Sequence, residues 1–255
     1  MSGVRERCFD ARERALAEIA NASREYLDRI VAEKGVMRLG VGGGATQRQL
    51  NQYMVHAWSS SRATSRVKIY LSDERCVPED DPYSNYGMIR ETLVLPLNMP
   101  VENLTRVPVE LGATLAARAY ADDLADGLGG SKAEPTLDLA ILGVGTDGHT
   151  ASLFPNGEAL KEEEALAAPG GYGPEGLERV TLTYPALARA KEVWILALGV
   201  EKQRIVQAIL GSRNGLEYCP VSELVERAQG RVTLWSDRGT TTASHDDYMA
   251  VHTKI

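Results

Sequence analysis

The segment from Gly143 to Pro155 holds the residues of this sequence that are best suited to chemistry. It reads Gly143-Val-Gly-Thr-Asp-Gly-His-Thr-Ala-Ser-Leu-Phe-Pro155, and His149 is one of only 4 histidines in the chain. An imidazole, with an ordinary pKa near about 6.5, suits a general base at neutral pH. Asp147, two positions earlier, is placed to hold its tautomer. A lone loop histidine is more often solvated, but the glycine turn before it and the Thr/Ser cluster after it favour catalysis.

A glycine-rich loop, Leu39-Gly-Val-Gly-Gly-Gly-Ala-Thr46, is the second candidate. A strand, a run of glycines and then a helix present backbone N–H groups and the positive end of a helix dipole to an anion. Phosphate binding is therefore the favoured interpretation. The G-x-G-x-x-A spacing leaves dinucleotide binding open, and a purely structural turn is a third possibility. The sequence has no G-K-[ST], which excludes a P-loop nucleotide site.

The third candidate is Ser72-Asp-Glu-Arg-Cys-Val-Pro78, where three consecutive residues are charged. A solvated loop with an internal ion pair is the plain interpretation. The place of the triplet beside the glycine loop favours a functional one, because Arg75 offers a planar fork for a phosphate. Cys76 has no fixed partner in view, so a catalytic cysteine is disfavoured. No G-x-S-x-G or H-E-x-x-H is present, so we predict neither a serine nucleophile nor a metal.

Apolar periodicity predicts an alternation of helices and strands that can position these loops. Such alternation is typical of a mostly parallel sheet covered by helices on both faces. We therefore predict an α/β fold, a single doubly wound, Rossmann-like domain over residues 1–255, with 169–176 as a surface loop. The predicted helices are 10–34, a helix from about 46, 85–95, 114–128 and 201–210, and the predicted strands are 36–41, 67–71, 137–144, 180–184, 193–198 and 232–235.

In such a fold, ligands bind at the carboxyl ends of the parallel strands. Four segments follow predicted strands and should meet on that rim. They are Gly40–Thr46, Leu71–Asn85, Gly143–Pro155 and Gly199–Lys202. The sequence therefore predicts one site that combines the glycine loop, the charged triplet and His149.

Composition narrows the class of partner. The formal charge is −7, with 28 basic and 35 acidic residues, and no long basic run, so we expect no nucleic-acid or anionic-membrane partner. The three cysteines form no CxxC, the N-terminus is not a signal peptide, and the strongest apolar run, 193–200, is far short of a membrane helix. We predict a cytoplasmic protein with a small-molecule substrate and a mobile segment over 239–255.

At these residues the sequence resembles the 6-phosphogluconolactonase family, part of the superfamily that also contains glucosamine-6-phosphate deaminase. The matching stretches run in the family's order and cover most of the chain, from about residue 39 to 237. The deaminase branch instead tends to carry an Asp-Glu-Tyr triplet and a DGHIAFNEP-like loop. The stretches are Asp73-Glu-Arg-Cys-Val-Pro78, Asp81-Pro-Tyr-Ser-Asn-Tyr86, Asp147-Gly-His-Thr-Ala-Ser-Leu-Phe-Pro155, Thr181-Leu-Thr-Tyr-Pro185 and Gly199-Val-Glu-Lys202.

This resemblance implies a cytosolic, cofactor-free and metal-independent hydrolase of the oxidative pentose phosphate pathway, expected to be monomeric. It would open 6-phospho-D-glucono-1,5-lactone to 6-phosphogluconate, with His149 as the base that activates water and Asp147 beside it. The implied phosphate ligands are Arg75, Lys202 and backbone N–H groups of Gly43, Gly44 and Thr46. Asp73 and Asn85 belong to matched motifs and are expected among the substrate-binding residues.

The glycine loop departs from the family pattern. The family usually has Ser-Gly-Gly-Ser-Thr-Pro, and this chain has Gly42-Gly-Gly-Ala-Thr-Gln47. Two hydroxyls and the proline that starts the helix are absent, while the backbone donors remain, so we expect a weaker or differently ordered phosphate site. Two alternatives stay open: an isomerase or deaminase of amino-sugar phosphates, which the Asp-Glu-Arg triplet disfavours, and a sugar-phosphate-binding regulatory module without turnover.

Overall fold

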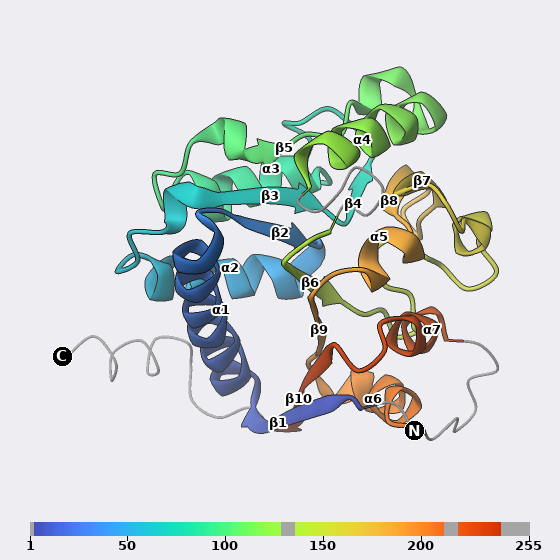
Figure 1. The fold of residues 1–255 in the computed structure, drawn as a ribbon. Helices are drawn as coiled ribbons and strands as arrows, with labels where there is room; N and C mark the ends of the chain where they lie inside the picture. The colour runs from blue at the N-terminus through green and yellow to red at the C-terminus, as the bar shows by residue number, and fades with distance from the viewer. Residues whose placement is uncertain (1–2, 129–135, 212–218, 241–255) are drawn as a thin grey trace.

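A seven-stranded sheet, in which every adjacent pair of strands is parallel, forms the centre of the computed structural model, which describes residues 3–128, 136–211 and 219–240 (Figure 1). The strand order is β1-β10-β9-β6-β2-β3-β5. The central strands are mostly apolar and almost wholly buried, as is typical of parallel strands. The bounds are β1 (Arg5–Ala11), β2 (Met37–Val41), β3 (Val67–Leu71), β5 (Leu104–Thr105), β6 (Leu139–Gly143), β9 (Glu192–Ala197) and β10 (Val232–Thr240).

Helices cover this sheet on both faces, with α1 and α2 side by side on one and α4, α5 and α7 beyond the other (Figure 1). The helix α1 ends at Gly35, whose φ of 77° is the left-handed conformation that glycine adopts easily. The helices are α1 (Arg12–Lys34), α2 (Gly44–Trp58), α3 (Asn85–Ile89), α4 (Ala113–Gly127), α5 (Tyr184–Ala188), α6 (Gln203–Ile209) and α7 (Pro220–Arg227), with a π-helical turn at Arg90–Val94 and 3-10 turns at Thr64–Arg66, Val101–Asn103, Val109–Leu111, Glu158–Lys161 and Val200–Lys202.

The predicted doubly wound α/β fold is confirmed, but an edge strand is missing from the prediction and one local prediction is wrong. The chain forms an edge strand, β1, before α1; its residues are mostly charged and exposed, so no apolar pattern announces it. The segment 169–176 is not simply a surface loop, because its first residues belong to β7 (Ala167–Tyr172). That strand completes a second, antiparallel sheet in the order β4-β8-β7, with β4 at Asp73–Arg75 and β8 at Glu178–Leu182. The predicted mobile segment lies outside the described residues, except for its first two.

The strand order reverses at β2, which has β3 on one side and β6 on the other. From β2 the chain builds outward through β3 and β5, and then returns to β6 and builds outward in the opposite direction. The connections therefore leave the carboxyl ends of β2 and β6 in diverging directions. This is the topological switch point, where open α/β sheets form a ligand crevice.

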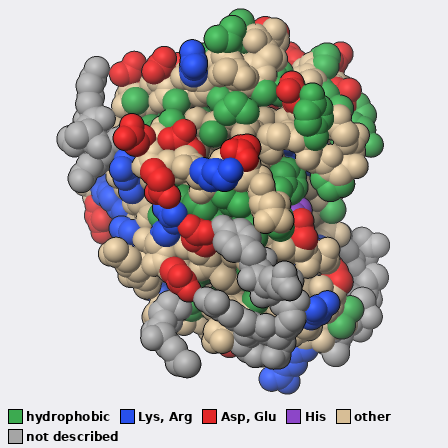
Figure 2. Space-filling model, turned by 90° about the vertical axis from the view of Figure 1, so that its right-hand side faces the viewer, with side chains coloured by type: hydrophobic (Ala, Val, Ile, Leu, Met, Phe, Trp, Pro, Cys, Tyr) green, Lys and Arg blue, Asp and Glu red, His purple; other side chains and the backbone are tan. Residues whose placement is uncertain are grey.

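Charge is mixed over the surface that Figure 2 presents. Acidic and basic side chains lie among one another there, and the described Lys and Arg side chains form no continuous patch on that face. None of the helices within the described ranges is long and apolar enough to cross a bilayer.

Asp138, directly before β6, is a buried charge that the fold surrounds with donors. Its carboxylate accepts hydrogen bonds from Lys34 Nζ at 2.7 Å, Lys191 Nζ at 3.3 Å and the Arg38 amide at 2.9 Å. Burial alone would raise the pKa of Asp138, but the Lys34 and Arg38 hydrogen bonds and the two lysine charges outweigh it and lower that pKa below its ordinary value. The carboxylate therefore stabilises the fold while it is ionised.

We expect Asp138→Asn to lower the free energy of unfolding by about 1–3 kcal/mol at neutral pH, because two lysines lose their buried partner. A lowered pKa gives stability that is present above the unfolded-state pKa of about 3.9 and is lost as the pH falls through the folded-state value. Denaturant unfolding at several pH values should therefore show the difference shrinking below about pH 4. Asp28→Asn, at a carboxylate whose side chain is 40% exposed, is the control and should lower the free energy of unfolding by less. A difference that is the same at every pH would contradict the prediction.

Candidate active site

A cleft of about 470 Å³ opens at the switch point, between the carboxyl ends of β2 and β6. It brings together all the residues that the sequence predicts for the site except two, Asp147 and Asn85, which contact lining residues without lining the cleft themselves. The predicted residues on the walls are Gly43, Gly44, Thr46, Asp73, Arg75, His149 and Lys202.

His149 is oriented by Asp147, which makes two contacts to it. The Nδ1 atom of the ring lies 2.6 Å from Asp147 Oδ1, and the backbone N–H of His149 donates to the same oxygen at 3.1 Å. Partial burial would raise the pKa of Asp147, but these hydrogen bonds and the imidazole charge lower it below its ordinary value. An ionised carboxylate only accepts hydrogen bonds, so Nδ1 carries the proton and Nε2 of the neutral ring is left as the acceptor.

The turn that presents this pair has no room for a side chain at Gly145. A β-carbon there would lie 2.2 Å from His149 Nδ1 and 2.5 Å from Asp147 Oδ1. The turn closes because the Gly145 N–H donates to the His149 carbonyl at 2.8 Å, and Gly148 adopts a φ of 83°. Thr150 ties the loop back to β6 by donating to the Gly143 carbonyl at 2.9 Å. Gly145 is thus required by the close approach of the ring to the backbone, and Gly148 by its positive φ.

The glycine loop passes equally close to Asn85. A β-carbon at Gly43 would lie 1.9 Å from Asn85 Oδ1, and Asn85 is itself buried, donating to the Asp73 carbonyl at 2.8 Å. Gly43 is also the N-cap of α2, and no side chain caps that helix. Its first-turn N–H groups are therefore left for an anion in the cleft.

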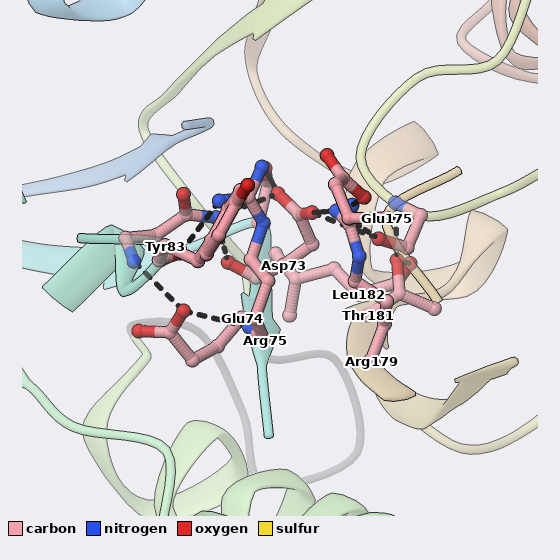
Figure 3. Close-up of polar contacts among 11 residues, drawn as sticks. Asp73, Glu74, Arg75, Tyr83, Glu175, Arg179, Thr181 and Leu182 are labelled. Carbon is pink, nitrogen blue, oxygen red and sulfur yellow. Dashed lines mark hydrogen bonds and ion pairs between the residues drawn. The ribbon is translucent and has the colours of Figure 1, made fainter. Parts of the chain in front are cut away.

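Two residues of the charged triplet line the cleft, and the third faces away from it. Asp73 faces the cleft and accepts hydrogen bonds from Ser152 Oγ at 2.8 Å and Arg179 Nη1 at 3.2 Å (Figure 3). Arg75 lines the cleft and donates to the Tyr83 carbonyl at 2.6 Å (Figure 3).

Glu74 faces away from the cleft and lies buried under the loop that leads into α3. Its carboxylate accepts from the backbone N–H groups of Arg75, Asn85 and Tyr86. Burial raises the pKa of Glu74 even though these amides oppose the shift. Its role is therefore to order residues 84–86, at the start of α3.

Arg179 was not predicted from the sequence, yet it is a wall of the cleft. It is buried, and its guanidinium bridges two carboxylates, Asp73 at 3.2 Å and Glu175 at 2.5 Å (Figure 3). Because its one positive charge is shared between two carboxylates, Arg179 joins β4 to β8 rather than offering a cation to a ligand.

Lys202 lies in the turn between β9 and α6, and β10 holds that turn in place. Gly199, with a φ of 109°, donates its N–H to the buried Asp237 carboxylate at 3.1 Å, and Gln203 donates to the Asp237 carbonyl at 2.6 Å. Lys202 therefore reaches the cleft from a turn anchored on both sides.

Arg12 is a second residue that sequence reasoning missed. It is the first residue of α1, lines the cleft, and donates to Thr46 Oγ1 at 3.1 Å. The sequence around it, Arg12-Glu-Arg14, is typical of a solvated helix surface, so no local signal distinguishes it. Only the parallel pairing of β1 with β10 brings the start of α1 to this rim.

The cysteine alternative finds no support in the geometry. Burial, together with the charges of Glu178 and Glu74, raises the pKa of the Cys76 thiol to about 11. A protonated thiol is a poor nucleophile at neutral pH. Within the described ranges no group of three or more His, Cys, Asp or Glu side chains is arranged to hold a metal, and the absence of a metal requirement stays a prediction.

The crowding at Gly145 can be tested directly. We expect Gly145→Ala to separate the His149 ring from Asp147, because the new methyl group would occupy the space of the ring nitrogen. The imidazole resonances of His149 should shift by NMR, and a crystal structure of the variant should show Nδ1 well beyond its present 2.6 Å from the Asp147 carboxylate. Gly143→Ala, where the methyl group would meet nothing within 4 Å, is the matched control and should leave those resonances in place. An unchanged His149–Asp147 pair in the Gly145 variant would contradict this account.

Comparison with known proteins identifies the family and matches the fold. Residues 10–235 match the family model of glucosamine-6-phosphate isomerases/6-phosphogluconolactonase. The chain is 37% identical to the 6-phosphogluconolactonase of Rattus norvegicus over 180 residues, 69% of this chain and 70% of that one. It is 33% identical to that of Mycobacterium tuberculosis over 212 residues, 80% and 83% of the two chains. The solved 6-phosphogluconolactonase of Trypanosoma cruzi superposes with a TM-score of 0.81 at 27% identity, covering 94% of this chain and 96% of that one. The resemblance drawn from the motifs is thus confirmed, and the chain belongs to the glucosamine-6-phosphate isomerase/6-phosphogluconolactonase family.

Proposed function

We propose that this protein is a lactone hydrolase that opens 6-phospho-D-glucono-1,5-lactone to 6-phosphogluconate. The family includes both isomerases and lactonases, so membership alone does not choose between them. The named relatives support the lactonase. The observation that carries the proposal is one cleft with the His149–Asp147 pair on one wall and Arg75, Lys202 and an uncapped glycine loop on the others.

The phosphate binds at the glycine loop in this proposal. The N–H groups of Gly43, Gly44 and Thr46 lie at the positive end of α2, and Arg75 and Lys202 add two cations. Backbone donors at a helix start and charged forks are the groups that bind phosphate dianions in proteins. They also offset the formal charge of −7, which would otherwise repel such a substrate.

His149 then acts on the lactone end of the anchored substrate. With Nδ1–H donated to Asp147, Nε2 accepts a proton from water as the water oxygen attacks the C1 carbonyl carbon. The carbonyl becomes a tetrahedral oxyanion. When it collapses, the bond from C1 to the ring oxygen breaks and the ring oxygen takes the proton from the His149 imidazolium. The products are the open-chain carboxylic acid, which ionises, and a free hydroxyl group.

Asp73 and Asn85 have supporting roles in this scheme. Asn85 stands behind Gly43 and bonds to Asp73, so it holds the glycine loop at its distance from the cleft. Asp73 lines the cleft with its carboxylate already engaged by Ser152 and Arg179. It can still accept a hydrogen bond from a hydroxyl of the sugar, since each carboxylate oxygen accepts more than one hydrogen bond.

The test is hydrolysis of freshly prepared 6-phosphogluconolactone, followed by a coupled dehydrogenase assay against the spontaneous rate. We expect His149→Gln to lower kcat by about 10²–10⁴-fold, because it removes a positioned base. Binding of 6-phosphogluconate should persist, because the phosphate ligands are untouched. His56→Gln, at an exposed position near the end of α2, is the control and should keep full activity.

Full turnover in the His149 variant would remove the base from the scheme. Ammonia release from glucosamine 6-phosphate by the wild type would favour the isomerase and deaminase branch instead. Binding of sugar phosphates without any turnover would favour a regulatory module. The monomeric state, the cytoplasmic location and the absence of a nucleic-acid partner stay predictions.

A further inference from the structure

We propose that Arg12 is a third cation for the substrate phosphate and that it also orients the hydroxyl of Thr46 toward that phosphate. This inference rests on the proposed phosphate end of the cleft and adds a residue to it. Arg12 comes from α1, outside every motif that the sequence shares with the family.

Arg12 joins three elements at the phosphate end of the cleft. Its Nη2 donates to Thr46 Oγ1 at 3.1 Å and its Nε donates to Gln49 Oε1 at 3.0 Å, both on α2. Its Nη1 reaches the carbonyl of Leu198, which directly precedes the turn that carries Lys202, at 3.4 Å. A guanidinium held at three points keeps its plane fixed, so its position does not depend on a ligand.

The charge of Arg12 remains available for a ligand. Within the described ranges, no carboxylate lies at ion-pair distance from its guanidinium, whereas Arg179 on the same cleft is paired with both Asp73 and Glu175. A guanidinium has five N–H donors, and the three neutral acceptors use three of them. Two donors and a full positive charge are therefore left at a side chain that lines the cleft.

The contact to Thr46 also determines where the threonine proton goes. A hydroxyl that accepts an N–H from one side presents its own proton on another. Thr46 Oγ1 accepts from Arg12, and Thr46 lines the cleft, so its O–H is free to donate into the cleft. A phosphate oxygen at the start of α2 would receive that proton.

The altered glycine loop gives this contact its importance. Gly42 and Ala45 carry no hydroxyl, so Thr46 is the loop's one side-chain donor between residues 42 and 46. Arg12 strengthens the site from a neighbouring helix in two ways, by its own charge and by ordering that hydroxyl. The expected consequence is a phosphate site whose affinity depends strongly on α1.

The test compares Arg12→Met, Arg12→Lys and Arg14→Met by steady-state kinetics and by calorimetric binding of 6-phosphogluconate and gluconate. Arg12→Met should raise KM for the phosphorylated lactone, and Kd for 6-phosphogluconate, by about ten- to a hundredfold, with kcat within about twofold. Gluconate binding and hydrolysis of glucono-1,5-lactone should not change, because neither ligand has a phosphate. Arg12→Lys should give KM and Kd values between those of the wild type and Arg12→Met, since lysine keeps the positive charge but lacks the planar guanidinium. Arg14, exposed on the same helix, is the matched control and should behave as the wild type.

A double-mutant cycle separates the two parts of the inference. If Arg12 orients Thr46, the effects of Arg12→Met and Thr46→Val on Kd will be less than additive, because either change breaks the same contact. Full additivity would remove the orienting role and leave the direct one.

Several outcomes would overturn the inference. An unchanged Kd for 6-phosphogluconate in Arg12→Met would overturn it. An equal loss of affinity for gluconate would also overturn it, because it would mean that Arg12 has a structural role only. A wild type that binds 6-phosphogluconate without hydrolysing the lactone would refute the proposed function, and the Kd comparison would still decide the role of Arg12. A wild type that binds no sugar phosphate would refute both.

Discussion

The site depends on how closely the backbone can approach its neighbours at the crevice between β2 and β6. Gly43 and Gly145 each occupy a position where a β-carbon would overlap a site side chain. One approach lets the glycine loop lie against Asn85, and the other lets the His149 ring lie against its own turn. Both loops are thereby drawn to the switch point, and the cleft is the space that remains between them.

Charge is distributed around this cleft according to what each group must do. Arg179 is paired with both Asp73 and Glu175 and joins the small antiparallel sheet to the rim, so its charge serves the structure. Asp147 is kept ionised by the backbone N–H of His149 and by the imidazole that it orients, which together lower its pKa. The cations that approach the glycine loop have no such counter-ion among the described residues, which lets a strongly negative protein present a locally positive pocket.

The sequence predicted the central sheet well, because buried parallel strands such as β6 and β9 contain continuous apolar runs. It also predicted the rim, since loops after parallel strands must meet at one edge. It could not predict β1, because β1 is an exposed edge strand of mostly charged residues. It could not predict the pairing of β7 with β8 either, because β7 contains Pro and Gly residues that are typical of loops. Arg12 and Arg179 were missed for the same reason: their function comes from tertiary pairing, and nothing in their local sequence marks them.

The position of β10 near the end of the described chain determines the order in which the parts of the cleft can form during synthesis. Arg5 on β1 contacts Thr233 on β10 across 228 residues, and α1 with Arg12 begins where β1 ends. The same strand supplies Asp237, which anchors the turn before Lys202. Arg12 and Lys202 thus reach their places only after the last described strand, β10, has been synthesised and has entered the sheet. A nascent chain on the ribosome would therefore hold the His149 turn, together with Val221 that donates to the Gly148 carbonyl, before it could complete the cationic side of the cleft.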